Sequence, residues 1–191
     1  MVIFIAGLVM FLAIHSVSIV APRWRDTQAA RLGERPWKGL YSLASIVSFV
    51  ALIYGYGIAR HTPVVVYLPP AALRHLALLL MVPVFPLLIA AYLPGRVKRF
   101  FRHPMLLAVI LWSVSHLIAN GTLADVLLFG GFLAWAVADL ISVSRRSIQR
   151  PVPGAPASAA NDVIVIVAGL ALYAFMLLWG HARLTGFSPL G

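Results

Sequence analysis

Six long apolar stretches, separated by short polar segments, follow one another along the chain. They cover roughly residues 2–20, 38–59, 71–93, 104–119, 122–141 and 162–180. Each comes close to the ~20 residues that an α-helix needs to cross a hydrocarbon layer about 30 Å thick. Runs such as LALLLMV and VIVIVAGLAL lack the alternation of polar and apolar residues that a membrane β-barrel requires. The pattern therefore predicts an all-α, polytopic transmembrane helix bundle of about six helices.

The segment between the last two apolar stretches differs in composition from the rest of the chain. Residues 147–161 are rich in Pro, Ala and Ser, which is typical of a flexible linker. We therefore expect a transmembrane core of five helices at 1–146, a flexible cytoplasmic loop at 147–161, and a C-terminal transmembrane helix with a short tail at 162–191. Thr122 and Asp125 have the spacing of a capping pair at the start of the fifth helix.

The composition excludes an ordinary soluble protein. Apolar residues make up 62% of the 191 residues and charged residues only 10%, whereas a typical globular domain carries about 25% charged residues. A soluble chain of this size buries only about 70% of the surface that it exposes when unfolded, which is too little to hide so much apolar area. The absence of Cys also excludes disulfides, Cys-ligated iron–sulfur clusters, thiolate chemistry and covalent haem attachment.

The basic residues lie mainly in alternate connecting segments. The first, third and fifth segments hold five, four and three of the 15 Lys and Arg residues, namely Arg23, Arg25, Arg31, Arg35 and Lys38, then Arg96, Lys98, Arg99 and Arg102, then Arg145, Arg146 and Arg150. Because Lys and Arg gather on the cytoplasmic side, this pattern predicts a multi-pass protein in contact with membrane lipid, with both termini outside the cytoplasm. The net charge of +10 does not indicate nucleic-acid binding, since no basic stretch lies on a soluble domain.

Four of the six His residues are conspicuous, because polar residues inside a membrane span are costly and usually face the bundle interior or a cavity. His15 lies inside the first apolar stretch and His116 inside the fourth, with Asn120 one helical turn later. His75 opens the third stretch. His103 opens the fourth, in the segment Arg102-His103-Pro104, where Pro suits the first turn of a helix.

These imidazoles admit three interpretations. Neutral His side chains on facing helices can hold a b-type haem or a metal ion, they can relay protons, or they can simply hydrogen-bond a neighbouring helix. We expect His61 and His181, which fall in loops or at helix ends, to lie in solvent or among lipid headgroups. Ser42, Ser45 and Ser48 recur along the second stretch and favour helix packing.

Several short motifs of this chain occur together in one known family. They are Ile14-His15-Ser16, Leu32-Gly33-Glu34-Arg35, Gly39-Leu40-Tyr41-Ser42, Tyr92-Leu93-Pro94-Gly95, Arg102-His103-Pro104-Met105-Leu106, His116-Leu117-Ile118-Ala119-Asn120-Gly121 and Leu128-Phe129-Gly130-Gly131-Phe132. As a set, over about residues 1–146, they resemble the NnrU family of bacterial inner-membrane proteins. The resemblance implies a location in the bacterial inner membrane, where the termini that the basic residues place outside the cytoplasm are periplasmic. It also implies a role connected with denitrification, through the expression or function of nitrite and nitric oxide reductases. It also implies membrane-bound reductase components as partners.

Plant zeta-carotene isomerase is similar to this family and holds haem b through His residues. Its motifs correspond to His15 in the His-Ser pair, to His103 in Arg-His-Pro and to His116 in the Trp-x-x-x-His segment. The resemblance therefore implies haem b as a cofactor, with His15 and His116 as the metal ligands. Where the plant enzyme has a Cys three residues before the second ligand, this chain has Ser113.

Depth in the membrane favours other pairs of His residues. His116 follows His103 by 13 residues, which is about 20 Å along a helix. With the N-terminus outside, His15 lies at the depth of His103, and His75 lies at the depth of His116. His15 and His116 stay the first candidates for ligands, with His75 and His103 as the alternatives.

Two other functions compete with that of a haem protein. A non-catalytic assembly factor for membrane-bound reductases would need none of the His side chains. A membrane methyltransferase resembling the isoprenylcysteine or phospholipid enzymes would use the Arg102-His103-Pro104 segment. Those enzymes place acidic side chains after it, whereas residues 105–111 are apolar here and Asp125 is the first carboxylate downstream. The sequence also lacks G-x-S-x-G, H-E-x-x-H and a phosphate-binding glycine loop.

Overall fold

The computed structural model describes residues 1–146 and 154–190. Contacts group the chain into two compact units, one formed by residues 1–67 and 121–145 and the other by residues 68–120 and 146–191. Residues 147–153 of the expected flexible loop lie outside the described residues, so its flexibility and the division expected at 146 and 161 stay predictions. Each unit is described by itself.

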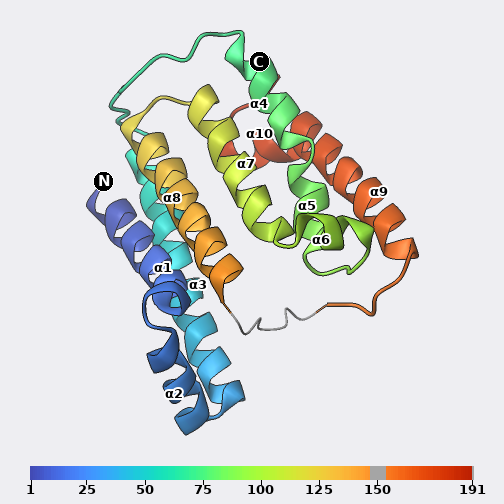
Figure 1. The fold of residues 1–191 in the computed structure, drawn as a ribbon. Helices are drawn as coiled ribbons and strands as arrows, with labels where there is room; N and C mark the ends of the chain where they lie inside the picture. The colour runs from blue at the N-terminus through green and yellow to red at the C-terminus, as the bar shows by residue number, and fades with distance from the viewer. Residues whose placement is uncertain (147–153, 191) are drawn as a thin grey trace. The chain divides into compact units, whose positions relative to one another are not determined.

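The first unit is built from three long helices, of which α1 (Val2–Val20) packs against both α3 (Glu34–Ala59) and α8 (Leu123–Arg145) (Figure 1). α1 and α3 approach each other closely at two glycines. A Cβ on Gly7 would overlap the backbone of Leu52, and a Cβ on Gly55 would overlap the backbone of Phe4. Small residues let membrane helices pack backbone against backbone, so these two positions require glycine.

A further helix lies where the hydropathy pattern predicts only a connecting segment. α2 (Pro22–Leu32) follows α1 with Pro in its first turn and leads into α3 through Gly33, whose φ of 86° lies in the region that favours glycine. Trp24 of α2 meets Trp37 of α3 with ring centres 5.9 Å apart. The apolar pattern misses this helix because its residues are mostly polar or basic.

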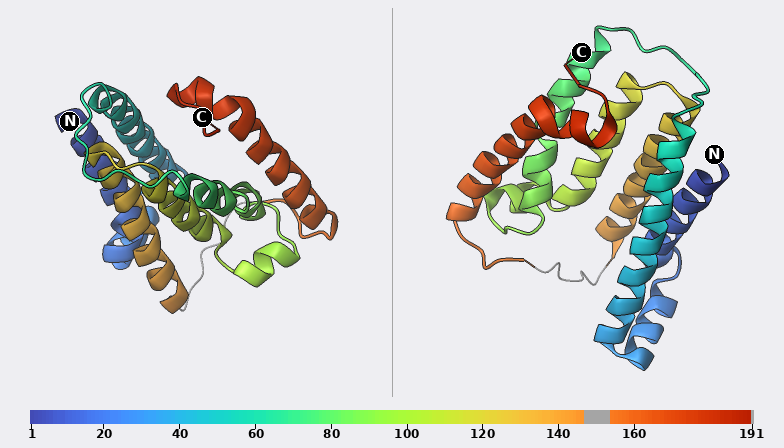
Figure 2. Two further views of the ribbon diagram at one scale, coloured as in Figure 1. Left: turned by 90° about the horizontal axis from the view of Figure 1, so that it is seen from above. Right: turned by 180° about the vertical axis from the view of Figure 1, so that it is seen from behind.

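The second unit is built from shorter helices and one π-helical turn. In chain order they are α4 (Leu73–Met81), α5 (Val84–Ala90), α6 (Arg96–Phe101), α7 (Pro104–Ala119), α9 (Ala160–Phe175), the π-helical η1 (Met176–Gly180) and α10 (His181–Thr185). Val84 and Leu87 of α5 form a buried core with Ala108 of α7. α9 packs on α5, with Gly169 against Pro86, so the C-terminal helix belongs to this unit (Figure 2).

The predicted membrane-spanning character of these helices is confirmed. Five described stretches are long and apolar enough to cross a membrane, namely Val2–Val20, Glu34–Ala59, Leu73–Ala90, Leu123–Arg145 and Ala160–Thr185. The sixth apolar helix, α7, has 16 residues, or about 24 Å at 1.5 Å per residue. Large apolar side chains such as Ile46 and Val50 of α3 are exposed, and in a bilayer such faces contact lipid. The chain is a polytopic helical membrane protein.

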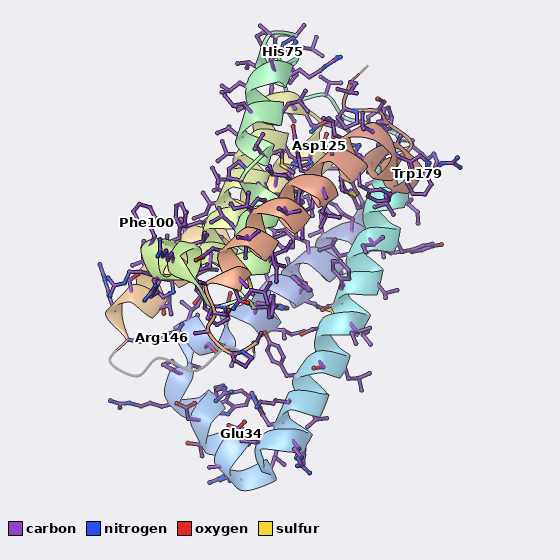
Figure 3. The ribbon with its side chains drawn as sticks, turned by 90° about the vertical axis from the view of Figure 1, so that its right-hand side faces the viewer. Glu34, His75, Phe100, Asp125, Arg146 and Trp179 are labelled. Carbon is purple, nitrogen blue, oxygen red and sulfur yellow. The ribbon has the colours of Figure 1, made fainter. Side chains whose placement is uncertain are left out.

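The short helix α6 joins α5 to α7 at the basic end of the second unit. It carries Arg96, Lys98 and Arg99, and the side chain of Phe100 beside them is exposed (Figure 3). The carboxylate of Asp162, at the start of α9, accepts a hydrogen bond of 3.0 Å from the backbone N–H of Val97. This contact caps α6 and ties it to α9. Basic and aromatic side chains in such a helix suit the polar surface of a bilayer.

Candidate functional site

His15 lies inside α1, in the first unit. Its Nδ1 lies 2.7 Å from the carbonyl oxygen of Phe11, one turn earlier in the same helix. Aromatic rings surround the imidazole. Phe11 stacks on it with ring centres 4.1 Å apart, and Tyr41 and Trp135 lie at 5.5 and 5.9 Å. The backbone therefore anchors one ring nitrogen of His15, while aromatic packing holds the rest of the ring.

His116 lies near the end of α7, in the second unit, and its Nδ1 makes the same kind of local contact. This nitrogen lies 2.8 Å from the carbonyl oxygen of Trp112. Asn120 follows at the end of the helix, where both its backbone N–H and its side-chain amide donate to the carbonyl oxygen of His116, at 2.8 and 3.0 Å. Asn120 thus closes the helix end that carries His116.

A second imidazole lies next to His116. His181 begins α10, and the centres of the two rings are 6.4 Å apart, with 29° between the ring planes. The Nδ1 of His181 lies 2.7 Å from the carbonyl oxygen of Phe187 and 3.2 Å from Oγ1 of Thr185. Sequence reasoning missed this neighbour of His116 because it considered His181 only as a residue at a helix end.

The π-helical turn η1 leads directly into His181. A π turn widens the helix locally and rotates the residues that follow relative to an unbroken α-helix. Gly180 ends this turn and is buried, and a Cβ there would lie 2.7 Å from Sδ of Met176 and 2.8 Å from the ring of Phe175. Because α9 and η1 form one apolar stretch in the sequence, the hydropathy pattern does not distinguish the π turn from a continuous α-helix.

His75 and His103 lie at opposite ends of the second unit. His75 is in the first turn of α4 (Figure 3) and lines a cavity of about 260 Å³ together with Arg74, Leu78 and the C-terminal Leu190. α4 begins at the end of this unit where α7 finishes (Figure 1). His75 therefore lies toward the same end as His116, as the depth argument expects, and His103, which precedes α7, lies toward the other.

The Arg102-His103-Pro104 segment is a helix junction. Arg102 follows α6 with a φ of 56°, and Pro104 is buried in the first turn of α7. The carbonyl oxygen of His103 accepts a hydrogen bond of 3.2 Å from the N–H of Leu107, which begins the hydrogen bonding of α7. The junction gives Arg102 and Pro104 a structural role in turning the chain.

A polar cluster at the start of α8 contains the predicted capping pair. Thr122 Oγ1 donates to Asp125 Oδ2 at 2.6 Å, and the backbone N–H of Asp125 lies 3.3 Å from Thr122 Oγ1. Tyr56 of α3 adds a contact that local spacing does not predict, since its hydroxyl donates to Asp125 Oδ1 at 2.5 Å. Burial, and to a smaller extent the Asp125 carboxylate, raises the pKa of the Tyr67 phenol in the nearby loop.

The His residues singled out from the sequence thus divide between the two units. His15 belongs to the first unit, and His75, His103 and His116 belong to the second, where His181 joins His116. Within residues 1–146 and 154–190, no three His, Asp or Glu side chains gather into a group able to hold a metal ion. His116 and His181 are therefore two neighbouring side chains of a type that can bind a metal, and a functional interpretation has to account for them.

One protein family matches almost the whole chain. The model of that family, described as NnrU protein, matches residues 3–189. No curated protein and no solved structure matches the chain. The match extends beyond the motifs within residues 1–146 and includes α9, η1 and α10, and hence His181.

Proposed function

Because the chain belongs to the NnrU family, we propose that it is a haem b-binding protein of the bacterial inner membrane with a role in denitrification. Membrane-bound nitrite or nitric oxide reductase components are the partners that this role implies. The distribution of Lys and Arg supports a periplasmic position for both termini. The observation that carries the haem proposal is the pair of neighbouring imidazoles, His116 and His181.

The two imidazole rings lie close to each other within the second unit. If both side chains held one iron, metal–nitrogen bonds of about 2 Å would require their rings to lie within several ångströms of each other. The distance between the ring centres of His116 and His181 is 6.4 Å. The two side chains come from helices far apart in the sequence, so their proximity is a property of the folded second unit.

Both imidazoles are also anchored in the way that metal-ligating His residues usually are. Such residues commonly hydrogen-bond a carbonyl oxygen with the ring nitrogen that does not bind the metal, which fixes the tautomer and makes the other nitrogen a better donor. Nδ1 of His116 has the carbonyl oxygen of Trp112 at 2.8 Å, and Nδ1 of His181 has that of Phe187 at 2.7 Å. Nε2 is therefore the donor atom that we assign on each ring.

Two imidazoles fit a haem better than a bare metal ion. A structural zinc ion takes about four ligands, whereas the described residues bring no three metal-binding side chains together. A haem iron has its porphyrin nitrogens and needs only axial ligands from the protein, for which His is common. Bound haem b would supply an iron able to change its redox state, in keeping with the role that the family implies.

His15 is the other ligand that the resemblance to the plant isomerase implies. It shares the Nδ1 anchor with His116, but the rings beside it are those of Phe11, Tyr41 and Trp135. We therefore propose that His116 and His181 would hold the haem iron and that His15 has a packing role. Variants at the three positions separate this assignment from the pair of His15 and His116.

The test of haem binding is the absorption spectrum of the purified protein in detergent, oxidised and reduced, after expression with ample haem precursor. We expect a Soret band and the sharp reduced-state bands of a six-coordinate haem b. A folded protein without Soret absorption contradicts the proposal and favours the non-catalytic assembly factor. Saturable binding of S-adenosylmethionine by such a haem-free protein would favour the methyltransferase.

A further inference from the structure

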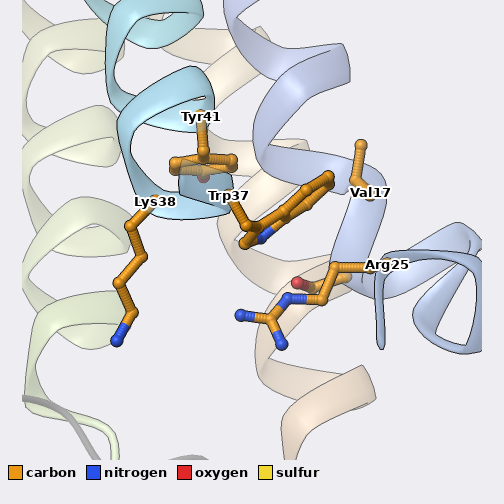
Figure 4. A pocket seen from close by; sticks show the side chains of 6 residues that line it. Val17, Arg25, Trp37, Lys38 and Tyr41 are labelled. Carbon is orange, nitrogen blue, oxygen red and sulfur yellow. The ribbon is translucent and has the colours of Figure 1, made fainter. Parts of the chain in front are cut away.

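The basic end of the first unit contains a cavity that the haem proposal does not use. Its volume is about 210 Å³. Three helices line it with Val17 and Ser18 from α1, Arg25 from α2, and Trp37, Lys38 and Tyr41 from α3. In Figure 4 the charged ends of Arg25 and Lys38 lie on the same side of the Trp37 and Tyr41 rings. Arg25 and Lys38, which come from different helices, therefore both line this small cavity.

We propose that this cavity binds the phosphate group of an anionic phospholipid. The guanidinium of Arg25 offers a planar fork of N–H donors that matches phosphate oxygens, and the ammonium of Lys38 adds a mobile point charge. Basic pockets between membrane helices on the cytoplasmic side bind the headgroups of anionic lipids. The distribution of Lys and Arg assigns this end of the unit to the cytoplasmic side.

The carboxylates beside Arg25 and Lys38 do not cancel the positive charge of this segment, which stays available to attract an anionic ligand. Arg25 lies 3.0 Å from Asp26, and Lys38 lies 2.7 Å from Glu34. The side chains of Asp26 and Glu34 are 57% and 67% exposed, and ion pairs with such exposed partners are weak. Residues 22–38 contain five basic residues and only two acidic ones. The cavity thus lies in a segment that stays positive even with both ion pairs formed.

The position of the cavity favours a lipid over a free phosphate ion. It lies where the apolar helix α1 ends and the basic helix α2 begins, which is the expected level of the headgroups. Trp37 and Tyr41 are residues of the type that gathers at this level. Farther along α3, on the face that carries Lys38, the side chains of Ile46 and Phe49 are exposed and offer an apolar surface to acyl chains.

The test measures lipid binding to the full-length purified protein in detergent by native mass spectrometry. Phosphatidylglycerol is the probe, phosphatidylcholine with the same acyl chains is the neutral comparison, and inorganic phosphate is the competitor. The test variant combines Arg25→Gln with Lys38→Gln. Its matched control combines Arg31→Gln with Arg35→Gln, which removes two charges from the same segment outside the cavity. We expect the affinity for phosphatidylglycerol to fall roughly tenfold or more in the test variant and less than about threefold in the control.

Equal losses in the two double variants would overturn the proposal, because general charge would then attract the lipid. Equal binding of the two lipids by the unmodified protein would overturn it as well. If millimolar phosphate displaced phosphatidylglycerol, the proposal of a lipid ligand would be overturned, and the cavity would be a site for a free anion.

The single substitution Lys38→Gln tests the proposal without disturbing the fold. The side chain of Lys38 is 66% exposed, so Lys38→Gln leaves the helix packing intact. We expect it to weaken phosphatidylglycerol binding about threefold with an unchanged unfolding temperature. Wild-type affinity in this variant contradicts the proposal. The haem spectrum is a separate readout, and neither result depends on the other.

Discussion

His15 and His116 occupy matched positions with different neighbours. Each lies in an apolar helix and holds its Nδ1 against the carbonyl oxygen four residues earlier, at 2.7 and 2.8 Å. The rings of Phe11, Tyr41 and Trp135 lie around His15, whereas the imidazole of His181 lies beside His116. The contact of Nδ1 therefore comes from the helix that carries each His residue. The second imidazole beside His116 comes from a segment far away in the sequence.

The largest effect is expected from His116→Ala, because it removes a donor from the proposed pair. We expect the haem content of the purified protein to fall roughly tenfold or more, measured as haem per protein from the absorption spectrum. His61→Ala, which removes a loop imidazole, is the control and should retain full haem content. A normal Soret band in folded His116→Ala protein would exclude His116 as a ligand.

The sharpest comparison is between His181→Ala and His15→Ala. If His116 and His181 share the iron, His181→Ala loses haem or leaves it five-coordinate and high-spin, because one axial ligand is missing. His15→Ala should keep the six-coordinate spectrum, since that change alters only aromatic packing in the first unit. The opposite outcome, with haem lost only in His15→Ala, would support the ligand pair of the plant isomerase instead.

Gly55→Ala tests whether the first unit can be weakened without affecting the pair in the second. Its Cβ would overlap the backbone of Phe4, and overpacking of this kind typically costs about 1–3 kcal/mol. We expect a lower unfolding temperature but unchanged haem per folded protein. Gly57→Ala, two residues farther along α3, meets nothing within 4 Å and should unfold like the wild type. Equal destabilisation of both variants would show that the close approach of α1 and α3 is not the cause.

The smallest effect is expected from Tyr56→Phe. The change removes the hydrogen bond to Asp125, which ties α3 to α8, while Thr122 continues to bond the carboxylate. The net loss of one such bond to a carboxylate is about 1.5 kcal/mol in the free energy of unfolding. Tyr54→Phe changes an exposed phenol on the same helix and serves as the control. Unchanged stability in Tyr56→Phe would show that this bond contributes nothing to the packing of the unit.

Features set by local composition could be predicted from the sequence. The apolar stretches predict the membrane helices because hydrocarbon admits few polar residues and requires internal backbone hydrogen bonding. The cap formed by Thr122 and Asp125 follows from a spacing of three residues. The position of His75 and His116 toward the same end of the second unit follows from helix rise and from counting crossings.

Features set by contacts between distant residues could not be predicted. α2 does not stand out in the apolar pattern because its residues are mostly polar or basic. Tyr56 reaches Asp125 across 69 positions of the chain. His181 meets His116 in a segment that follows a π turn within an otherwise continuous apolar stretch. Sequence reasoning therefore identified one member of the proposed ligand pair, and the fold was needed to identify the other.

The most direct test of the central claim replaces one donor with a different one and identifies the axial ligands spectroscopically. Met can serve as an axial ligand of haem and raises the reduction potential relative to His. Near-infrared magnetic circular dichroism of the oxidised protein distinguishes two imidazole ligands from one imidazole and one thioether. We predict a two-imidazole signature for the wild type and for His15→Met, and an imidazole–thioether signature with a raised potential for His181→Met. A His181→Met protein that keeps the wild-type signature and potential would contradict the account.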